Sequence, residues 1–258
     1  MPEVTLDRPE DGVALVTLNR PDARNALSRT SLDELDALMV EIEGDDRSRC
    51  VVLTGAGSAF CAGLDLAELE RDPTGLLFHT GPQRLRELPL PIIAAVNGAA
   101  VTGGLELALA ADFRLASDRA KFADTHALVG LVPGWGMTTA LPMAVGDARA
   151  REMSFTGRFV GADEAVAIGL VNRVVSSETL LDDALATAVS IAQNDGHAVR
   201  AMLELYRVGA RSRIAAADLD ERLTFRRWSE HLRPEDIAQR RDAVIERGRR
   251  LQREQSGG

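Results

Sequence analysis

The sequence predicts an α/β fold with a largely parallel sheet, followed by a helical C-terminal region. In the N-terminal part, short apolar runs alternate with helix-like segments, which is the order of strand, loop and helix in parallel α/β proteins. From about residue 195, strand-like runs stop and charged residues recur at amphipathic helical spacing. We therefore expect an α/β core over residues 1–195 and a helical region over residues 196–258, with Gly196 at the boundary.

The elements of the core follow in order from their local composition. Apolar runs predict strands over residues 13–18, 50–55, 91–98, 113–116 and 121–124. Helical periodicity predicts helices over residues 31–42, 64–71 and 103–111, and a short helix packed on a strand within residues 156–175. The C-terminal helices are expected over residues 177–193, 197–210, 214–230 and 234–251. In such folds, ligand sites lie at strand ends and at the helix N-termini that follow them.

Composition indicates a globular protein and argues against nucleic-acid binding. The chain has 258 residues, of which 45% are hydrophobic, so it can bury a large core. No apolar stretch approaches the roughly 20 residues that a membrane span needs, and the N-terminus lacks the pattern of a signal peptide, so we expect a cytoplasmic protein. The net charge of −9 opposes nonspecific binding to nucleic acid.

Cysteine and lysine are both rare. Cys50 and Cys61 are the only cysteines and have no metal-ligand spacing, so neither a disulfide framework nor a metal site is expected. Lys121 is the only lysine, and a basic contact to a phosphate group is therefore expected from arginine, whose planar fork suits phosphate.

Two segments, residues 57–69 and 97–109, place small residues directly before an apolar helix. Small residues let a ligand approach the backbone, and the first N–H groups of a helix are unpaired and carry partial positive charge. Two such turns facing each other could bind a developing oxyanion. The candidate positions are Gly63, Leu64, Gly103 and Gly104. Alternatively, these glycines only form ordinary turns and loops.

Glu106 follows the second of these turns. A glutamate in the first turn of a helix ordinarily stabilises the helix dipole by about 0.3–1 kcal/mol. Beside an oxyanion site, the same carboxylate would be placed to act as a catalytic acid or base. The residues alone leave both readings open.

The chain resembles the crotonase, or enoyl-CoA hydratase/isomerase, superfamily over most of its length. The segments that carry the resemblance are "LNRPDARNALS" (18–28), "AFCAGLDL" (59–66), "PIIAAVNGAAVTGGLELALAADFRLAS" (91–117), "LVGLVPGWG" (128–136) and "TGRFVGADEAVAIGLVNRVV" (156–175). The resemblance implies a crotonase-like spiral of β-β-α turns, acyl-CoA thioester substrates and an enolate bound by two backbone N–H groups. It also implies association into a trimer or a dimer of trimers, with the C-terminal helices at or near the interfaces.

Position by position, the resemblance implies that Leu64 and Gly103 supply the backbone donors and that Glu106 is a catalytic carboxylate. It further implies that Ala62 and Gly63 lie along the CoA chain and that Arg24 reaches the CoA phosphates, with a solvated surface arginine as the alternative. The remaining candidates for substrate binding or the pocket wall are Asp65, Gly104, Gly134, Trp135 and Phe78, and for the two aromatic residues a plain core role is the alternative. We expect no cofactor other than the CoA that the substrate carries, and no metal.

His126 occupies the position where hydratases of the superfamily keep a second carboxylate. Neutral imidazole can accept a proton and imidazolium can donate one, with a pKa near 6.5 when unperturbed. His126 could therefore share the proton transfer, with Asp124 as its orienting partner. A structural or pocket-lining histidine is the alternative.

Glu106 favours hydration of 2-enoyl-CoA thioesters, a hydro-lyase reaction. The resemblance also leaves isomerase, CoA hydrolase and decarboxylase activities open, because these members of the superfamily use the same oxyanion hole with other acid and base groups. An acyl-CoA-binding protein without catalysis also remains open, because the second carboxylate is absent. The sequence contains neither a G-x-S-x-G elbow nor a complete dinucleotide fingerprint, which argues against an α/β-hydrolase and a nicotinamide enzyme.

Overall fold

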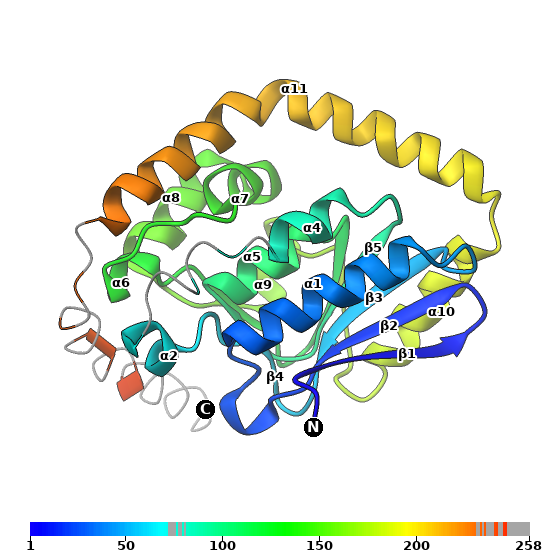
Figure 1. Ribbon diagram of the computed structural model, residues 1–258, viewed down its shortest axis with the longest axis horizontal. Coiled ribbons are helices and arrows are strands. Elements are labelled where there is room, and N and C mark those ends of the chain that lie inside the picture. The colour runs from blue at the N-terminus through cyan, green and yellow to red at the C-terminus, as the bar shows by residue number, and fades with distance from the viewer. Residues whose placement is uncertain are drawn as a thin grey trace.

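The computed structural model describes residues 1–71, 76, 79, 81–230, 233, 235, 240, 241, 245 and 246, with backbone alone for residues 81 and 209–216. In this part of the chain, ten strands form two sheets (Figure 1). The six-stranded sheet has the order β1 (Val4–Glu10), β2 (Val13–Leu18), β3 (Cys50–Gly55), β5 (Ile92–Val96), β7 (Phe113–Ser117) and β10 (Arg173–Val175). The four-stranded sheet has the order β4 (Ala59–Cys61), β6 (Ala99–Val101), β8 (Lys121–Ala123) and β9 (Val160–Gly161).

The strands pair in parallel except at β1–β2 and β8–β9, which are antiparallel. The helices between them are α1 (Arg29–Glu43), α2 (Leu66–Arg71), α4 (Gly81–Glu87), α5 (Gly103–Ala110), α6 (His126–Val129), α7 (Met137–Val145), α8 (Asp147–Thr156) and α9 (Ala162–Ala167). A short 3₁₀ helix, η1 (Pro21–Ala23), precedes α1, and the chain continues with α10 (Leu180–Ala192) and α11 (Gly196–Ser229).

The same β-β-α unit recurs three times, as β3-β4-α2, β5-β6-α5 and β7-β8-α6. In each unit the first strand joins the larger sheet and the second joins the smaller one. The chain therefore advances as a spiral of β-β-α turns, and each turn brings a helix N-terminus to the smaller sheet. This α/β architecture confirms the predicted fold class.

Both faces of the larger sheet are covered, as expected for parallel strands. Along β5, Ile92, Ala94 and Val96 join the main core cluster, whereas Ile93 and Ala95 pack in a second cluster with residues of α10. The apolar run in the sequence is therefore a strand that alternates between two cores.

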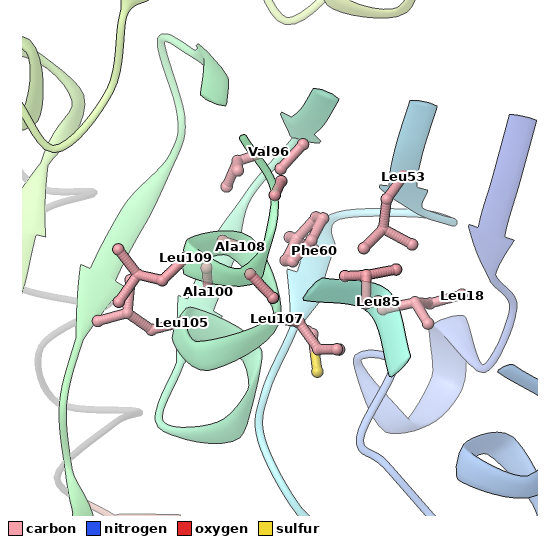
Figure 2. Close-up of a cluster of buried hydrophobic side chains, with 14 of the residues drawn as sticks. Leu18, Leu53, Phe60, Leu85, Val96, Ala100, Leu105, Leu107, Ala108 and Leu109 are labelled. Carbon is pink, nitrogen blue, oxygen red and sulfur yellow. The ribbon is translucent and has the colours of Figure 1, made fainter. Parts of the chain in front are cut away.

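Helix α5 lies inside the main core, and all eight of its residues are buried. Figure 2 shows its leucines in a cluster with Phe60 and Leu53. Glu106 is the only charged residue of this helix. Burying a carboxylate in such apolar surroundings costs free energy unless the carboxylate is hydrogen-bonded.

Several elements differ from the predictions. The two helices expected over residues 197–210 and 214–230 are one helix, α11, which starts after Asp195, whose side chain accepts a hydrogen bond of 2.8 Å from the Ala198 amide. Strands β1, β4, β6 and β9 and helices α4, α6, α7 and α8 were not predicted. The helix predicted over residues 234–251 falls mostly outside the described residues.

Within the described residues, no helix combines the length and apolar character required to cross a membrane.

Candidate active site

A cavity of about 640 Å³ opens where the N-terminus of α5 meets the loop before α2. Most of its lining residues are apolar. The walls come from η1, the loop before α2, the N-terminus of α5, helix α6 and the loop after it, together with Phe159 and, from the C-terminal region, Phe225, Arg241 and Ile245. Nine of the residues predicted for the site line this cavity: Arg24, Ala62, Leu64, Asp65, Gly103, Glu106, His126, Gly134 and Trp135. Phe78 lies outside the described residues.

The two predicted backbone donors lie close together. The Leu27 amide donates to the Gly63 carbonyl at 2.8 Å and the Asp65 amide donates to the Leu27 carbonyl at 2.9 Å, so the N–H of Leu64 between them faces away from Leu27. A Cβ placed on Gly103 would stand 3.7 Å from the Cα of Gly63, so the two turns are in contact. Within the described part of the chain, no hydrogen bond occupies the N–H of Leu64 or of Gly103.

Thr102 makes the turn that starts α5 at the cavity. Its backbone has φ 54° and ψ −113°, a conformation that L-residues rarely adopt. Its amide donates to the Ala123 carbonyl at 2.8 Å, and its hydroxyl is hydrogen-bonded to that of Thr125. Thr102 was not predicted, because a β-branched residue gives no sequence indication of a positive φ.

Gly63 and Gly104 are not among the residues that line the cavity, and the substrate contacts predicted for them stay predictions. Both are buried. A Cβ on Gly104 would stand 2.1 Å from the carbonyl oxygen of Cys61. Gly104 is therefore needed for the close approach of α5 to β4, and Gly63 supports the loop through the hydrogen bond that its carbonyl accepts from Leu27.

Asp65 and Arg24 lie at the cavity but also support its loops. One carboxylate oxygen of Asp65 accepts hydrogen bonds from the amides of Ala67 at 3.1 Å and Glu68 at 3.2 Å, at the start of α2. The other oxygen pairs with Arg20 at 3.0 Å. The carbonyl of Arg24 accepts a hydrogen bond from the Ala62 amide at 3.1 Å, which joins the η1 turn to the first donor loop.

Glu106 is the most buried carboxylate of the cavity, with 2% of its surface exposed. Its Oε1 accepts hydrogen bonds from the amides of Trp135 at 3.1 Å and Met137 at 3.3 Å. Burial raises the pKa of Glu106 to about 7, against the lowering effect of the His126 charge. A group with this pKa is populated in both protonation states near neutral pH, as an acid–base catalyst requires.

His126 stands between Glu106 and Asp124. Its Nε2 lies 3.8 Å from Oε2 of Glu106, and its Nδ1 lies 2.7 Å from Oδ1 of Asp124. Burial alone would lower the pKa of His126, but the hydrogen bond to Asp124 and the charge of Glu106 raise it overall. Although Asp124 is also buried, His126 holds the pKa of that carboxyl below its usual value. Asp124 therefore orients the imidazole with Nε2 toward Glu106.

One further contributor, Phe225, was not predicted because it comes from a distant part of the chain. Phe225 of α11 lines the cavity. A Cβ on Gly134 would stand 2.9 Å from the Phe225 ring, so the helix packs directly on this part of the wall. The indole of Trp135 lies over the second donor, with Cζ3 at 3.2 Å from the position of a Cβ on Gly103.

Comparison with known proteins agrees with this geometry. The model of the enoyl-CoA hydratase/isomerase family matches residues 8–239. A short-chain-enoyl-CoA hydratase of Clostridium acetobutylicum is 40% identical over 223 residues, which cover 84% of this chain and 84% of that protein. A 1,2-epoxyphenylacetyl-CoA isomerase of Escherichia coli is 38% identical over 202 residues, covering 74% and 77% of the two chains.

The solved structures agree as well. The crystal structure of an enoyl-CoA hydratase from Mycobacterium smegmatis is 42% identical and superposes with a TM-score of 0.81, covering 90% of this chain and 100% of that one. The family match spans most of the sequence, and the fold carries the same spiral as the resemblance implied. The chain therefore belongs to the enoyl-CoA hydratase/isomerase family, within the crotonase superfamily.

Proposed function

We propose that the protein is an enoyl-CoA hydratase, a hydro-lyase that adds water to the double bond of 2-enoyl-CoA thioesters. The observation that carries this proposal is the buried Glu106, with a pKa raised to about 7, in the same cavity as two unoccupied backbone N–H groups. The hydratases among the relatives support the same activity.

In the proposed reaction, Glu106 accepts a proton from water as the water oxygen bonds to Cβ of the substrate. The electron pair of the double bond moves toward the thioester, and the enolate oxygen accepts hydrogen bonds from the N–H groups of Leu64 and Gly103. A proton then bonds to Cα, from imidazolium at His126 or from Glu106 itself. Water is consumed and no other reactant is needed, so the reaction requires no cofactor beyond the CoA of the substrate.

The acyl chain is proposed to lie along the apolar walls near Leu64, Gly134 and Trp135, which line the cavity. The CoA portion is proposed to leave past Ala62, Asp65 and Arg24, which also line the cavity. Arg24 would then be placed to contact phosphate groups. The cytoplasmic location stays a prediction.

A panel of CoA thioesters tests this function. Purified protein is incubated with enoyl-, 3-hydroxyacyl- and malonyl-type CoA thioesters, and the products are identified by mass spectrometry. We expect 3-hydroxyacyl-CoA from the enoyl thioesters and the reverse reaction from the 3-hydroxyacyl thioesters. Migration of the double bond without gain of water would instead identify an isomerase, the activity named for the Escherichia coli relative. Binding without turnover would contradict catalysis altogether.

We also propose that the protein forms a trimer or a dimer of trimers through its C-terminal helices. Helix α11 runs along one side of the molecule (Figure 1). It exposes large apolar side chains, among them Met202, Leu205, Tyr206, Leu219 and Leu223. Exposed apolar surface of this kind is typical of an interface, and closed symmetry would bury it. Light scattering at micromolar concentration is expected to give the mass of three or six chains, and a stable monomer would contradict the proposal.

A further inference from the structure

The peptide unit between Trp135 and Gly136 is bound from two directions by side chains of opposite charge. Its carbonyl oxygen, on Trp135, accepts a hydrogen bond from Nη2 of Arg86 in α4. Its N–H, on Gly136, donates to Oε1 of Glu221 in α11. Two helices that are far apart in the sequence therefore hold the two ends of one peptide dipole.

The amides on either side of this peptide are the hydrogen-bond donors of Glu106. Trp135 N and Met137 N both donate to its Oε1. An uncompensated change of ψ at Trp135 or of φ at Gly136, the two angles next to this peptide, would swing the Trp135 and Met137 amides apart, so that they could no longer bind the same carboxylate oxygen. The orientation of the peptide unit is thus coupled to the environment of Glu106.

Gly136 makes this arrangement possible and also makes it dependent on partners. Its φ is 90°, in the region that favours glycine, and a Cβ there would stand 2.2 Å from Nη1 of Arg86. Only glycine lets the guanidinium approach this peptide. Because glycine leaves the backbone free to adopt other angles, the conformation has to be held by groups outside the turn.

Glu221 supplies a strong attachment for the turn. The residue is 8% exposed, and its Oε2 accepts hydrogen bonds from the amide of Thr138 at 2.8 Å and from the Thr138 hydroxyl. Charge-assisted hydrogen bonds are stronger than neutral ones, and a carboxylate also interacts favourably with the first turn of a helix, here α7. Glu221 and Glu106 thus share the N-terminus of α7, each bound to different amides.

We propose that Arg86 and Glu221 are positioning residues of the active site: they hold the turn of residues 134–138 so that the amides of Trp135 and Met137 bind Glu106. The proposal rests on the proposed function, because it requires Glu106 to be the catalytic acid or base. It gives α11 a part in catalysis beyond covering the core.

The charges around Glu106 provide a readout that a purely structural role would not give. Burial has the largest effect on the pKa of Glu106 and raises it; Glu221 and Asp124 raise it further, whereas His126 and Arg86 lower it. Removing the charge of Glu221 should therefore lower the pKa of Glu106, and removing the charge of Arg86 should raise it. The two positioning residues have opposite effects on pH dependence although they hold the same peptide.

The test compares Glu221→Gln and Arg86→Gln in the full-length enzyme with crotonyl-CoA as substrate. We expect both variants to lower kcat by roughly 10- to 100-fold with little change in KM, because the catalytic carboxylate is misplaced while the binding pocket remains. The acid limb of kcat/KM, where activity falls as Glu106 gains a proton, should move to lower pH in Glu221→Gln and to higher pH in Arg86→Gln. Arg86→Lys keeps the charge and should keep the limb of the wild type.

Asp218→Asn is the matched control. Asp218 lies one turn before Glu221 on α11 and binds the hydroxyl of Thr139 at 2.6 Å, but it touches no donor of Glu106. This variant should keep the kcat and pH profile of the wild type, whereas a general loss of α11 docking would lower its activity too. Thermal unfolding identifies any variant that is not folded, and Arg86→Gln and Glu221→Gln each carry the test without the other.

The outcomes separate this proposal from the proposed function. If the wild type hydrates crotonyl-CoA but Glu221→Gln and Arg86→Gln retain its kcat and pH profile, the positioning roles are wrong and the hydratase function stands. Reduced kcat with an unmoved acid limb in both variants would also contradict the positioning roles, because it would show that the two residues only stabilise the local structure. If the wild type hydrates no enoyl thioester, the function itself is wrong.

Discussion

Replacing Glu106 with glutamine is expected to lower kcat for crotonyl-CoA hydration by about 100-fold or more, without a comparable loss of affinity for the CoA thioester. Glutamine keeps the size of the side chain and an oxygen that can accept the hydrogen bonds of Trp135 and Met137. It cannot accept a proton from water, so the first chemical step loses its base. Steady-state kinetics measures kcat, and calorimetric titration with a saturated acyl-CoA measures affinity.

Glu43→Gln is a suitable control for this variant, because Glu43 is an exposed residue at the end of α1, away from the cavity residues. It should behave as the wild type in both measurements. If Glu106→Gln hydrates crotonyl-CoA within a few-fold of the wild-type rate, the catalytic assignment of Glu106 is wrong. If affinity falls as strongly as kcat, the substitution has disturbed the cavity and not only the proton transfer.

The parts of the fold that were predicted are those whose signals are local. Helix α1 was recognised because its buried residues Leu32, Leu35, Met39 and Ile42 repeat at helical spacing. Strands β4 and β6 have three residues each, too few to show a period of two, and they were missed although β8, which is equally short, was predicted. Both lie inside the segments that were read as glycine-rich and alanine-rich turns.

Helix α11 shows a limit of prediction from amphipathic periodicity. Two helices were predicted where the backbone continues through residues 211–213, a polar stretch without an apolar residue to extend the amphipathic pattern. Arginine is a good helix former, so local propensity allows the helix to continue even where no apolar stripe marks it. Periodicity detects burial of one helix face and is silent where both faces are polar.

The residues of the candidate site also divide into those that a local motif predicts and those that only tertiary packing brings to the site. Leu64, Gly103 and Glu106 lie next to the turns that identified them, so short motifs were sufficient to place them. The contacts of Glu221 with Gly136 and of Arg86 with Trp135 join residues 85 and 49 positions apart in the chain. Neither residue stands in a motif, and only the packing of α4 and α11 against the turn before α7 brings them together.

His126→Gln is expected to remove a limb from the pH dependence of kcat. The hydrogen bond to Asp124 and the charge of Glu106 outweigh the effect of burial and raise the pKa of His126 above its usual value of 6.5. Because a raised pKa extends the pH range in which the imidazole is protonated, we expect His126 to donate the proton to Cα, and the activity of the wild type to fall as pH rises above about 6.5. Kinetics on crotonyl-CoA as a function of pH measures the limb.

The glutamine variant removes the titrating ring, so its residual activity should follow Glu106 alone and lack the decline at high pH. Asp124→Asn separates the role of the ring from that of its partner: this variant keeps His126 but removes the carboxylate that raises its pKa. The decline should therefore persist in Asp124→Asn and begin at lower pH than in the wild type. A decline toward low pH in the wild type that is lost in His126→Gln would make the imidazole a base instead of an acid. If His126→Gln keeps the wild-type kcat and pH profile, His126 only lines the pocket, and Glu106 must both accept the proton from water and return it to Cα.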